Sequence, residues 1–328
     1  MKNDKKFIFI ITGPTASGKT ACADQLAHLL DCEVINVDVG QFYTPLSVGT
    51  AKPDWKNFTY PCHLFDIISE PKDLTVVHYR TLVIDKIKEI QDRGRIPILV
   101  GGSLFYIKSI FFPPHEFNTI DQFDETRTSD IKPDDLWDSL YVIDPDRAAK
   151  IHKNDTYRLQ RALHIWQKTG QKPSSFLPKV HVPFNTILIS LVPEKEFLRD
   201  QIKKRTIEMI THDGWIKEAK KLIGTEWETF LEAKGLIGYS EIFAWLKNGA
   251  IVSDLDALIN TIQLETIHYA KRQLTFLKGF IQLINKYQEQ YKQEEYVIIT
   301  ETIKQVTRQE IERIAALTKR LGKNVDLR

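Results

Sequence analysis

The sequence predicts an α/β fold with a parallel sheet at its core and a small helical insert. Short apolar runs alternate with amphipathic helical patterns through the N-terminal third of the chain, and a glycine-rich turn joins the first run to the first helix. From residue 113 to residue 184 the pattern changes to prolines, acidic residues and short helical segments. Alternating strands and helices are typical of parallel sheets. We therefore expect a core of residues 1–112 and 185–328 and an insert of residues 113–184.

The first strand, helix and turn carry a phosphate-binding motif. The apolar run Phe7–Thr12 is followed by "GPTASGKT" and by a helix that begins near Lys19. Glycines at this spacing let backbone N–H groups face phosphate oxygens, the lysine adds a full charge, and a hydroxyl at Thr20 is suited to ligate magnesium. The core is therefore expected to be P-loop NTPase-like. The predicted phosphate-binding residues are Gly13, Pro14, Thr15, Ala16, Ser17, Gly18, Lys19 and Thr20. A turn without a ligand is the alternative interpretation.

Two further strands are predicted at Cys32–Asp38 and Ile96–Gly102, with a helix over Val77–Arg93 between them. Each strand ends in residues suited to ligand binding, namely Thr12, Asp38 and the stretch from Gly101 to Ser103. Ligands bind at the carboxyl ends of parallel strands, so these residues are expected to converge at one edge of the sheet.

The pattern changes again beyond residue 140. A helix is expected after Asn154 or Asp155, with Gly170 at its end. "NTILISLV" reads as a possible edge strand, and the chain from there to Lys286 reads as mainly helical. The last forty residues predict a weak strand at "EYVIIT" and a charged helix, and no function is assigned to them.

Composition excludes several classes of protein. No apolar run reaches the roughly 20 residues that a membrane span needs, and "MKNDKK" does not resemble a signal peptide, so we expect a soluble cytoplasmic protein that does not enter membranes. The three cysteines are odd in number and lack C-x-x-C spacing, which argues against a disulfide framework and a zinc site. A formal net charge of +2 is too small to indicate nucleic-acid binding by itself.

Several cations stand in informative positions. Arg205 shares a helical stripe with the apolar residues Leu198, Ile202 and Met209, so it needs an anion, which could be a ligand or a structural carboxylate. Arg158 and Arg161 lie one helical turn apart, where they could grip an RNA backbone or stay solvated. Lys271 and Arg272 are interleaved with Tyr269 and Phe276, which suits base stacking and phosphate contact but also fits a solvated helix face.

The motifs taken together resemble one family, the tRNA dimethylallyltransferases. The matching stretches are "GPTASGKT", "DVGQFYTPLSVGTAKP", "HLFD", "VGGSLFY", "IDPDRAAKIHKNDTYRLQRAL", "RTIEM", "IGYSE" and "YAKRQLTF". They follow the family's order and cover the chain from about residue 6 to about residue 280. The phosphate loop alone fits many nucleotide enzymes, whereas "VGTAKP" and "YAKRQ" are far more specific.

The resemblance implies an activity and roles for the site residues. The loop would hold the diphosphate of dimethylallyl diphosphate, and the dimethylallyl group would pass to N6 of the adenosine 3′ of the anticodon in tRNAs reading UNN codons, with release of pyrophosphate. By the family pattern Asp38 accepts the N6 proton. Lys19, Arg205 and a magnesium ion on Thr20 stabilise the leaving group. Ser103, where the family usually has threonine, supplies a hydroxyl.

The resemblance also implies a partner, the tRNA anticodon stem-loop, and we expect the protein to act as a monomer. The residues expected to contact tRNA are Asp38, Gln41, Arg158, Gln160, Arg161, Lys271, Arg272 and Gln273. For two of them a different role fits the sequence as well. Asp38 could cap a turn or ligate magnesium, and Gln41 could be a structural loop amide.

The sequence departs from the family pattern at several positions. Val39 replaces a serine beside Asp38, Leu104 replaces a glycine and is expected to narrow the donor channel or change the turn, and Phe276 replaces a tryptophan. The insert is about a dozen residues short. Three other activities therefore stay open: an ATP-dependent small-molecule kinase, an enzyme that prenylates free adenine nucleotides, and a catalytically weakened RNA-binding protein.

Overall fold

A computed structural model describes residues 7–113, 135–176, 183–290 and 297–318 of the chain. The chain divides into two units, one made of residues 1–110 and 182–328 and the other of residues 111–181. This division lies within a few residues of the boundaries expected from the sequence.

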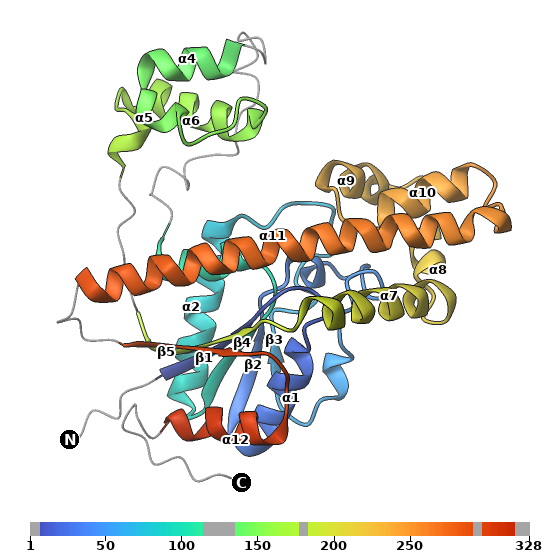
Figure 1. Ribbon diagram of the computed structural model, residues 1–328, viewed down its shortest axis with the longest axis horizontal. Coiled ribbons are helices and arrows are strands. Elements are labelled where there is room, and N and C mark those ends of the chain that lie inside the picture. Colours follow the sequence, from blue (N-terminus) through green and yellow to red (C-terminus); the bar gives the residue numbers. More distant parts are fainter. Residues whose placement is uncertain (1–6, 114–134, 177–182, 291–296, 319–328) are drawn as a thin grey trace. The chain divides into compact units, whose positions relative to one another are not determined.

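The first unit contains a six-stranded sheet in which every neighbouring pair of strands is parallel (Figure 1). Its order is β3-β2-β4-β1-β5-β6. The strands are β1 (Phe7–Thr12), β2 (Cys32–Asn36), β3 (Cys62–His63), β4 (Ile96–Val100), β5 (Asn185–Leu191) and β6 (Ile298–Ile303). The expectation that "NTILISLV" forms an edge strand is wrong, because β5 lies between β1 and β6 and is buried along its whole length. A strand covered on both faces reads as a continuous apolar run, and such a run does not tell an inner strand from an edge strand.

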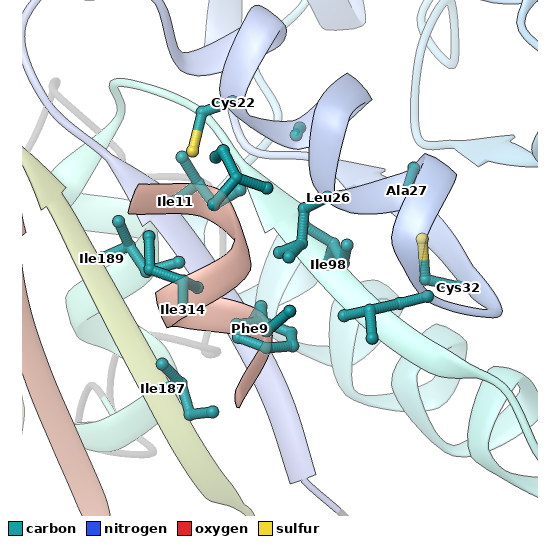
Figure 2. Packing of buried hydrophobic residues seen from close by; sticks show 14 of the residues in the cluster. Phe9, Ile11, Cys22, Leu26, Ala27, Cys32, Ile98, Ile187, Ile189 and Ile314 are labelled. Carbon is teal, nitrogen blue, oxygen red and sulfur yellow. The ribbon is translucent and has the colours of Figure 1, made fainter. Parts of the chain in front are cut away.

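One face of the sheet packs against α1 (Lys19–Leu29) and α12 (Arg308–Ala316). The contact is a single apolar cluster that includes Phe9 and Ile11 of β1, Leu26 of α1 and Ile314 of α12 (Figure 2). Alternate residues of a strand point to opposite faces, so the intervening β1 residues pack on the other side of the sheet. The last part of the chain, which the sequence left without a function, therefore supplies the edge strand and one helix of the core.

The remaining helices of the first unit are α2 (Val76–Asp92), α3 (Leu104–Phe111), α7 (Lys195–Thr211), α8 (Trp215–Lys220), α9 (Glu226–Lys234), α10 (Tyr239–Lys247) and α11 (Leu255–Gln290). Short 3₁₀ turns occupy Val39–Phe42, Trp55–Asn57 and Val252–Asp254. The 36-residue helix α11 extends about 54 Å at 1.5 Å per residue and runs beside α7 (Figure 1). One helix thus reaches from the sheet to the α8–α10 cluster.

The second unit packs α4 (Leu136–Ile143), α5 (Pro145–Ala148) and α6 (Thr156–Thr169) around its own apolar cluster, followed by a 3₁₀ turn at Pro173–Ser175. The predicted ends of the α6 helix are confirmed. The Asp155 carboxylate accepts a hydrogen bond from the Arg158 backbone N–H at 3.1 Å, and Gly170 ends the helix at φ 66°.

None of the helices among the described residues combines the length and the apolar character that a membrane span requires.

Candidate active site

The carboxyl ends of the three central strands meet at one edge of the sheet, as predicted. The Thr12 hydroxyl at the end of β1 donates to the Gly101 carbonyl after β4 at 2.9 Å, and the Val37 N–H after β2 donates to the Val100 carbonyl at 2.8 Å. Gly101 allows this close approach, because a Cβ atom there would lie 2.0 Å from the Val37 carbonyl oxygen. The residues after β1, β2 and β4 are therefore held together.

The phosphate loop after β1 wraps around the side chain of Lys19. The Lys19 Nζ donates to the carbonyls of Pro14 at 2.7 Å and Gly13 at 3.2 Å. A side chain on Gly13 would collide with the Leu191 carbonyl, since its Cβ would lie 2.5 Å away. Gly18 caps α1 with φ 88°. Burial lowers the pKa of Lys19 to about 8, although the nearby Asp38 carboxylate acts in the opposite direction.

Asp38 begins the turn after β2, and Asn36 fixes its position. The Asn36 Oδ1 accepts from the Asp38 N–H at 2.9 Å, and its Nδ2 donates to the Leu64 carbonyl at 3.0 Å. The Asp38 carboxylate accepts from the Gly40 N–H at 3.3 Å, so it also caps the 3₁₀ turn. Burial raises the pKa of Asp38, whereas Lys19 and then the Gly40 hydrogen bond lower it. A carboxylate with a raised pKa is a better proton acceptor near neutral pH.

A cavity of about 380 Å³ lies against Asp38 and the phosphate loop. Polar and charged lining residues come from seven segments of the first unit: Thr15, Asp38, Thr50, Ser103, Arg205, Thr206, Lys234, Thr266, Tyr269, Arg272 and Gln273. Apolar lining residues are Ala16, Val39, Ala51, Ile202, Met209, Trp215, Leu236 and Ile237, and the remaining lining residues are Gly40, Gly49 and Gly235. A second cavity of about 690 Å³ shares Ala51, Arg205 and Met209 with the first. The first cavity is therefore lined by both charged and apolar side chains.

Arg205 reaches the cavity from α7, on which Leu198, Ile202 and Met209 are buried as the helical stripe predicts. Burial lowers the pKa of Arg205, and the Asp38 carboxylate opposes this effect. Within the described residues Arg205 forms no ion pair, so no structural carboxylate there is paired with its guanidinium. The alternative of a structural salt bridge is therefore not supported, and the guanidinium can contact an anionic ligand.

The loop from Ser47 to Ala51 is held in place by Glu218 of α8. The Glu218 carboxylate accepts from three consecutive backbone N–H groups, of Ser47 at 2.8 Å, Val48 at 2.7 Å and Gly49 at 3.0 Å, and from the Tyr239 hydroxyl at 2.7 Å. Sequence reasoning missed Glu218, because about 170 residues separate it from the loop and no local pattern pairs them. Its four hydrogen bonds place Thr50 and Ala51 on the cavity wall.

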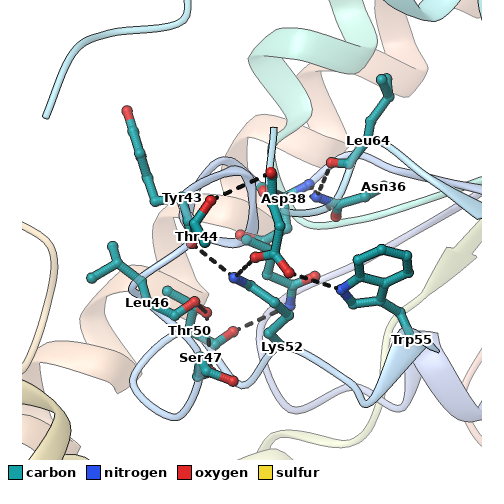
Figure 3. A network of polar contacts seen from close by, with 12 residues as sticks. Asn36, Asp38, Tyr43, Thr44, Leu46, Ser47, Thr50, Lys52, Trp55 and Leu64 are labelled. Atoms are coloured by element: carbon teal, nitrogen blue, oxygen red, sulfur yellow. Dashed lines mark hydrogen bonds and ion pairs between the residues drawn. The ribbon is translucent and has the colours of Figure 1, made fainter. Parts of the chain in front are cut away.

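A second set of contacts holds the other side of this loop (Figure 3). The Lys52 ammonium pairs with the Asp66 carboxylate and donates to the Tyr43 carbonyl at 2.8 Å. The Trp55 Nε1 donates to the same carboxylate at 3.1 Å. Gln41, predicted to contact tRNA, donates through its Nε2 to the carbonyls of Thr50 at 3.2 Å and Ala51 at 3.3 Å. These two hydrogen bonds give the Gln41 amide nitrogen a structural role in the loop, which agrees with the alternative interpretation of this residue.

The structure distributes the other residues predicted to contact tRNA over both units. Lys271 and Arg272 are exposed on α11, and the Arg272 guanidinium lies 5.8 Å from the centre of the Tyr269 ring. Arg158, Gln160 and Arg161 lie on α6 of the second unit, where Arg158 pairs with Asp155 at 3.3 Å.

Gln273 is placed differently from the prediction. Its side chain is buried, its Oε1 accepts from the Thr15 N–H at 2.8 Å, and its Nε2 donates to the Gly102 carbonyl at 3.1 Å. Both ends of the amide are therefore bonded to the protein, which does not support the predicted tRNA contact.

Two departures from the expected motifs differ in their consequences. Val39 lines the cavity. Its backbone N–H donates to the Ser103 hydroxyl oxygen at 3.0 Å, and this hydrogen bond fixes the position of the hydroxyl. Leu104 is buried at the start of α3 and is absent from the cavity wall. The expectation that Leu104 narrows the donor channel is therefore wrong, since its side chain packs into the core instead.

The residues around the loop fit a magnesium ion held mainly by a bound diphosphate. Thr20 lies in the first turn of α1, beside Lys19, and is exposed. The described part of the chain contains no group of three His, Cys, Asp or Glu side chains that could form a metal cage. Magnesium typically takes few protein ligands and relies on substrate phosphates and water. A single hydroxyl beside the phosphate loop agrees with this pattern.

The parallel sheet and the loop after β1 define a P-loop NTPase-like α/β protein. Residues 41–280 match the family described as IPP transferase. A tRNA dimethylallyltransferase of Rickettsia conorii is 38% identical over 290 residues, which cover 85% of this chain and 78% of that protein. One from Limosilactobacillus reuteri is 35% identical over 284 residues, covering 83% and 90%. The chain therefore belongs to the IPP transferase family.

Solved structures agree with this assignment. A eukaryotic dimethylallyltransferase acting on tRNA superposes with a TM-score of 0.74 at 28% identity, covering 85% of this chain and 72% of that one. The full-length tRNA isopentenylpyrophosphate transferase of Bacillus halodurans gives 0.63 at 30% identity, covering 97% and 96%.

The charge of Lys19 gives the site a pH dependence that can be measured. Lys19 loses its charge as the pH rises through about 8, so pyrophosphate should bind about tenfold more weakly at pH 9 than at pH 7. Calorimetric titration with magnesium present measures this change. Lys19→Met is the control for titration of pyrophosphate itself, and an equal pH dependence in both proteins would contradict the prediction.

Proposed function

We propose that this protein transfers a dimethylallyl group from dimethylallyl diphosphate to N6 of the adenosine 3′ of the anticodon in tRNAs that read UNN codons, releasing pyrophosphate. The observation that carries the proposal is one cavity lined by the phosphate loop, by Asp38 and Arg205, and by apolar side chains. Membership of the IPP transferase family and the names of the relatives support the same reaction. A kinase or an enzyme acting on free nucleotides is not favoured by these relatives.

The reaction breaks the bond between the prenyl C1 and the diphosphate oxygen and forms a bond between C1 and N6. The electron pair of the broken bond leaves on pyrophosphate, and the N6 proton passes to Asp38. Adenine N6 is a weak nucleophile because its lone pair is delocalised into the ring, so the reaction needs a positioned acceptor. The raised pKa of Asp38 suits this acceptor role, and the Ser103 hydroxyl beside it can orient the amino group.

Negative charge grows on the diphosphate as the carbon–oxygen bond breaks. Arg205 and the loop residues Thr15 and Ala16 line the cavity, and Lys19 is bonded to the carbonyls of the same loop. These groups would stabilise the growing charge, and their burial strengthens the effect. A magnesium ion on Thr20 would, when bound, neutralise part of the diphosphate charge. The apolar residues Ile202 and Met209 offer a wall for the five-carbon prenyl group.

The target adenosine must leave its base stack to reach this cavity. Two helices of the chain carry side chains that can contact RNA phosphates. These exposed or half-exposed residues are Lys271 and Arg272 on α11 and Arg158, Gln160 and Arg161 on α6. Binding through phosphates predicts an affinity that falls with salt concentration. We also propose that the protein acts as a monomer in the cytoplasm.

The decisive experiment supplies magnesium, labelled dimethylallyl diphosphate and unmodified tRNA that reads a UNN codon. Label is expected in the adenosine next to the anticodon, and a transcript with guanosine at that position is the control. Label in free adenine nucleotides, or equal label in the control transcript, would overturn the proposal. Transfer of the γ-phosphate of ATP instead would identify a kinase.

Asp38→Asn should abolish turnover while leaving tRNA affinity within about threefold. The amide keeps the shape and the contact with the Gly40 N–H but cannot accept the N6 proton, so we expect kcat to fall by about 10³-fold. Single-turnover transfer measures the rate and filter binding measures the affinity. A kcat within about tenfold of the wild type would show that Asp38 is not the proton acceptor.

Arg205→Ala should weaken use of the donor, because it removes a guanidinium that faces the diphosphate. We expect kcat/KM for dimethylallyl diphosphate to fall about 100-fold. Arg199→Ala is the matched control, since Arg199 lies on the same helix and its ion pair among the described residues is with Glu196 at 3.5 Å. Equal, small effects of both substitutions would make Arg205 a structural residue.

A further inference from the structure

Helix α11 carries a buried glutamine that ties together two loops of the active site. Gln273 is 6% exposed, and its amide has a defined orientation. The Oε1 atom accepts from the Thr15 N–H of the phosphate loop at 2.8 Å, and Nε2 donates to the Gly102 carbonyl, after β4, at 3.1 Å. If the amide were rotated by 180°, its NH₂ group would face the Thr15 N–H and its oxygen would face the Gly102 carbonyl oxygen. The two contacts therefore require a glutamine in this orientation.

The contacts of Gly102 and Ser103 continue toward Asp38. The Gly102 backbone lowers the pKa of the Asp38 carboxyl, against the larger effect of burial. The next residue, Ser103, accepts from the Val39 N–H at 3.0 Å and donates its own N–H to the Val37 carbonyl at 3.2 Å. Gln273 thus stands between the loop that holds phosphate and the turn that holds the carboxylate.

Gly102 is part of this arrangement because the glutamine packs directly against it. A Cβ atom at Gly102 would lie 2.6 Å from the Gln273 Nε2. The same helix carries Tyr269 and Arg272, which line the cavity with Gln273 itself. Any displacement of α11 would therefore be transmitted to the phosphate loop and to the segment from Gly102 to Ser103.

We propose that Gln273 is a positioning residue for the transfer reaction: by bonding Thr15 and Gly102 together, it fixes the distance between the diphosphate site and the Asp38 carboxylate. The inference rests on the proposed function. It gives Gln273 a role inside the protein in place of the tRNA contact expected from the sequence. The attacking nitrogen and the leaving oxygen must lie on opposite sides of one carbon, so an error of about 1 Å in this spacing costs about 100-fold in rate.

The chain contains a matched control on the same helix. Gln263 is 7% exposed, and its Nε2 donates to the Lys203 carbonyl of α7 at 3.2 Å; neither Gln263 nor Lys203 lines the cavity. Gln273→Met and Gln263→Met each remove one buried amide and keep a side chain of similar length. Both should lower the melting temperature, but only the first should affect the chemical step.

The experiment measures steady-state transfer to tRNA as a function of donor concentration and pH for the wild type and both variants, normalised to folded protein. For Gln273→Met we expect kcat to fall 30- to 100-fold, with KM for dimethylallyl diphosphate changed less than about fivefold. Loosening of Gly102 weakens the effect by which its backbone lowers the pKa of Asp38, so the acid limb of kcat should move to higher pH. Gln263→Met should keep kcat within about threefold and leave the pH profile unchanged.

A second variant covers the case in which Gln273→Met does not fold. The carboxylate of Gln273→Glu still accepts from the Thr15 N–H but repels the Gly102 carbonyl, so kcat should fall at least tenfold with the same shift of the acid limb. Unchanged kcat and pH profile in a folded Gln273 variant, or an equal loss in Gln263→Met, would overturn the positioning role. Wild-type transfer is measured first, and its absence would overturn the proposed function itself.

Discussion

Asp38 lies at the carboxyl end of β2, where the charges of Lys19 and Arg205 act on it from the phosphate loop and from α7. Burial alone would favour a neutral carboxyl and would also discharge the lysine. The attraction between the Asp38 carboxylate and the two cations limits both effects, although Arg205 itself lowers the pKa of Lys19. The balance leaves a carboxylate that can accept a proton beside cations that can hold an anion. Displacing any one of the three elements would upset it, so the surrounding structure has to hold them in place.

Two polar side chains hold the loops of the backbone around this group. Glu218 gathers three consecutive N–H groups of the loop from Ser47 to Gly49, and Gln273 joins the phosphate loop to Gly102. Each is engaged at both of its polar atoms, so neither leaves a buried polar group without a partner. Loops carry the functional groups of many α/β enzymes, and here buried hydrogen bonds from helices limit the freedom of those loops.

The C-terminal elements β6 and α12 also help to hold the phosphate loop in place. β6 extends the sheet beyond β5, and α12 packs beside α1, whose first turn carries Lys19 and Thr20. The apolar cluster beneath α1 therefore holds this helix, and with it Lys19 and Thr20, against the sheet. A segment without any recognisable motif contributes to the site through packing alone.

The sequence by itself determined the parallel α/β core, the phosphate loop, the convergence of three strand ends and the family. These features depend on short-range patterns such as "GPTASGKT" and on apolar periodicity, which a linear chain displays directly. Only the tertiary structure decided that β5 lies inside the sheet, that Leu104 packs into the core and that Gln273 bonds to Thr15 and Gly102. The physical reason is distance along the chain: Gln273 lies 258 residues from Thr15 and 171 from Gly102, and no local pattern records which side chains long-range packing brings together.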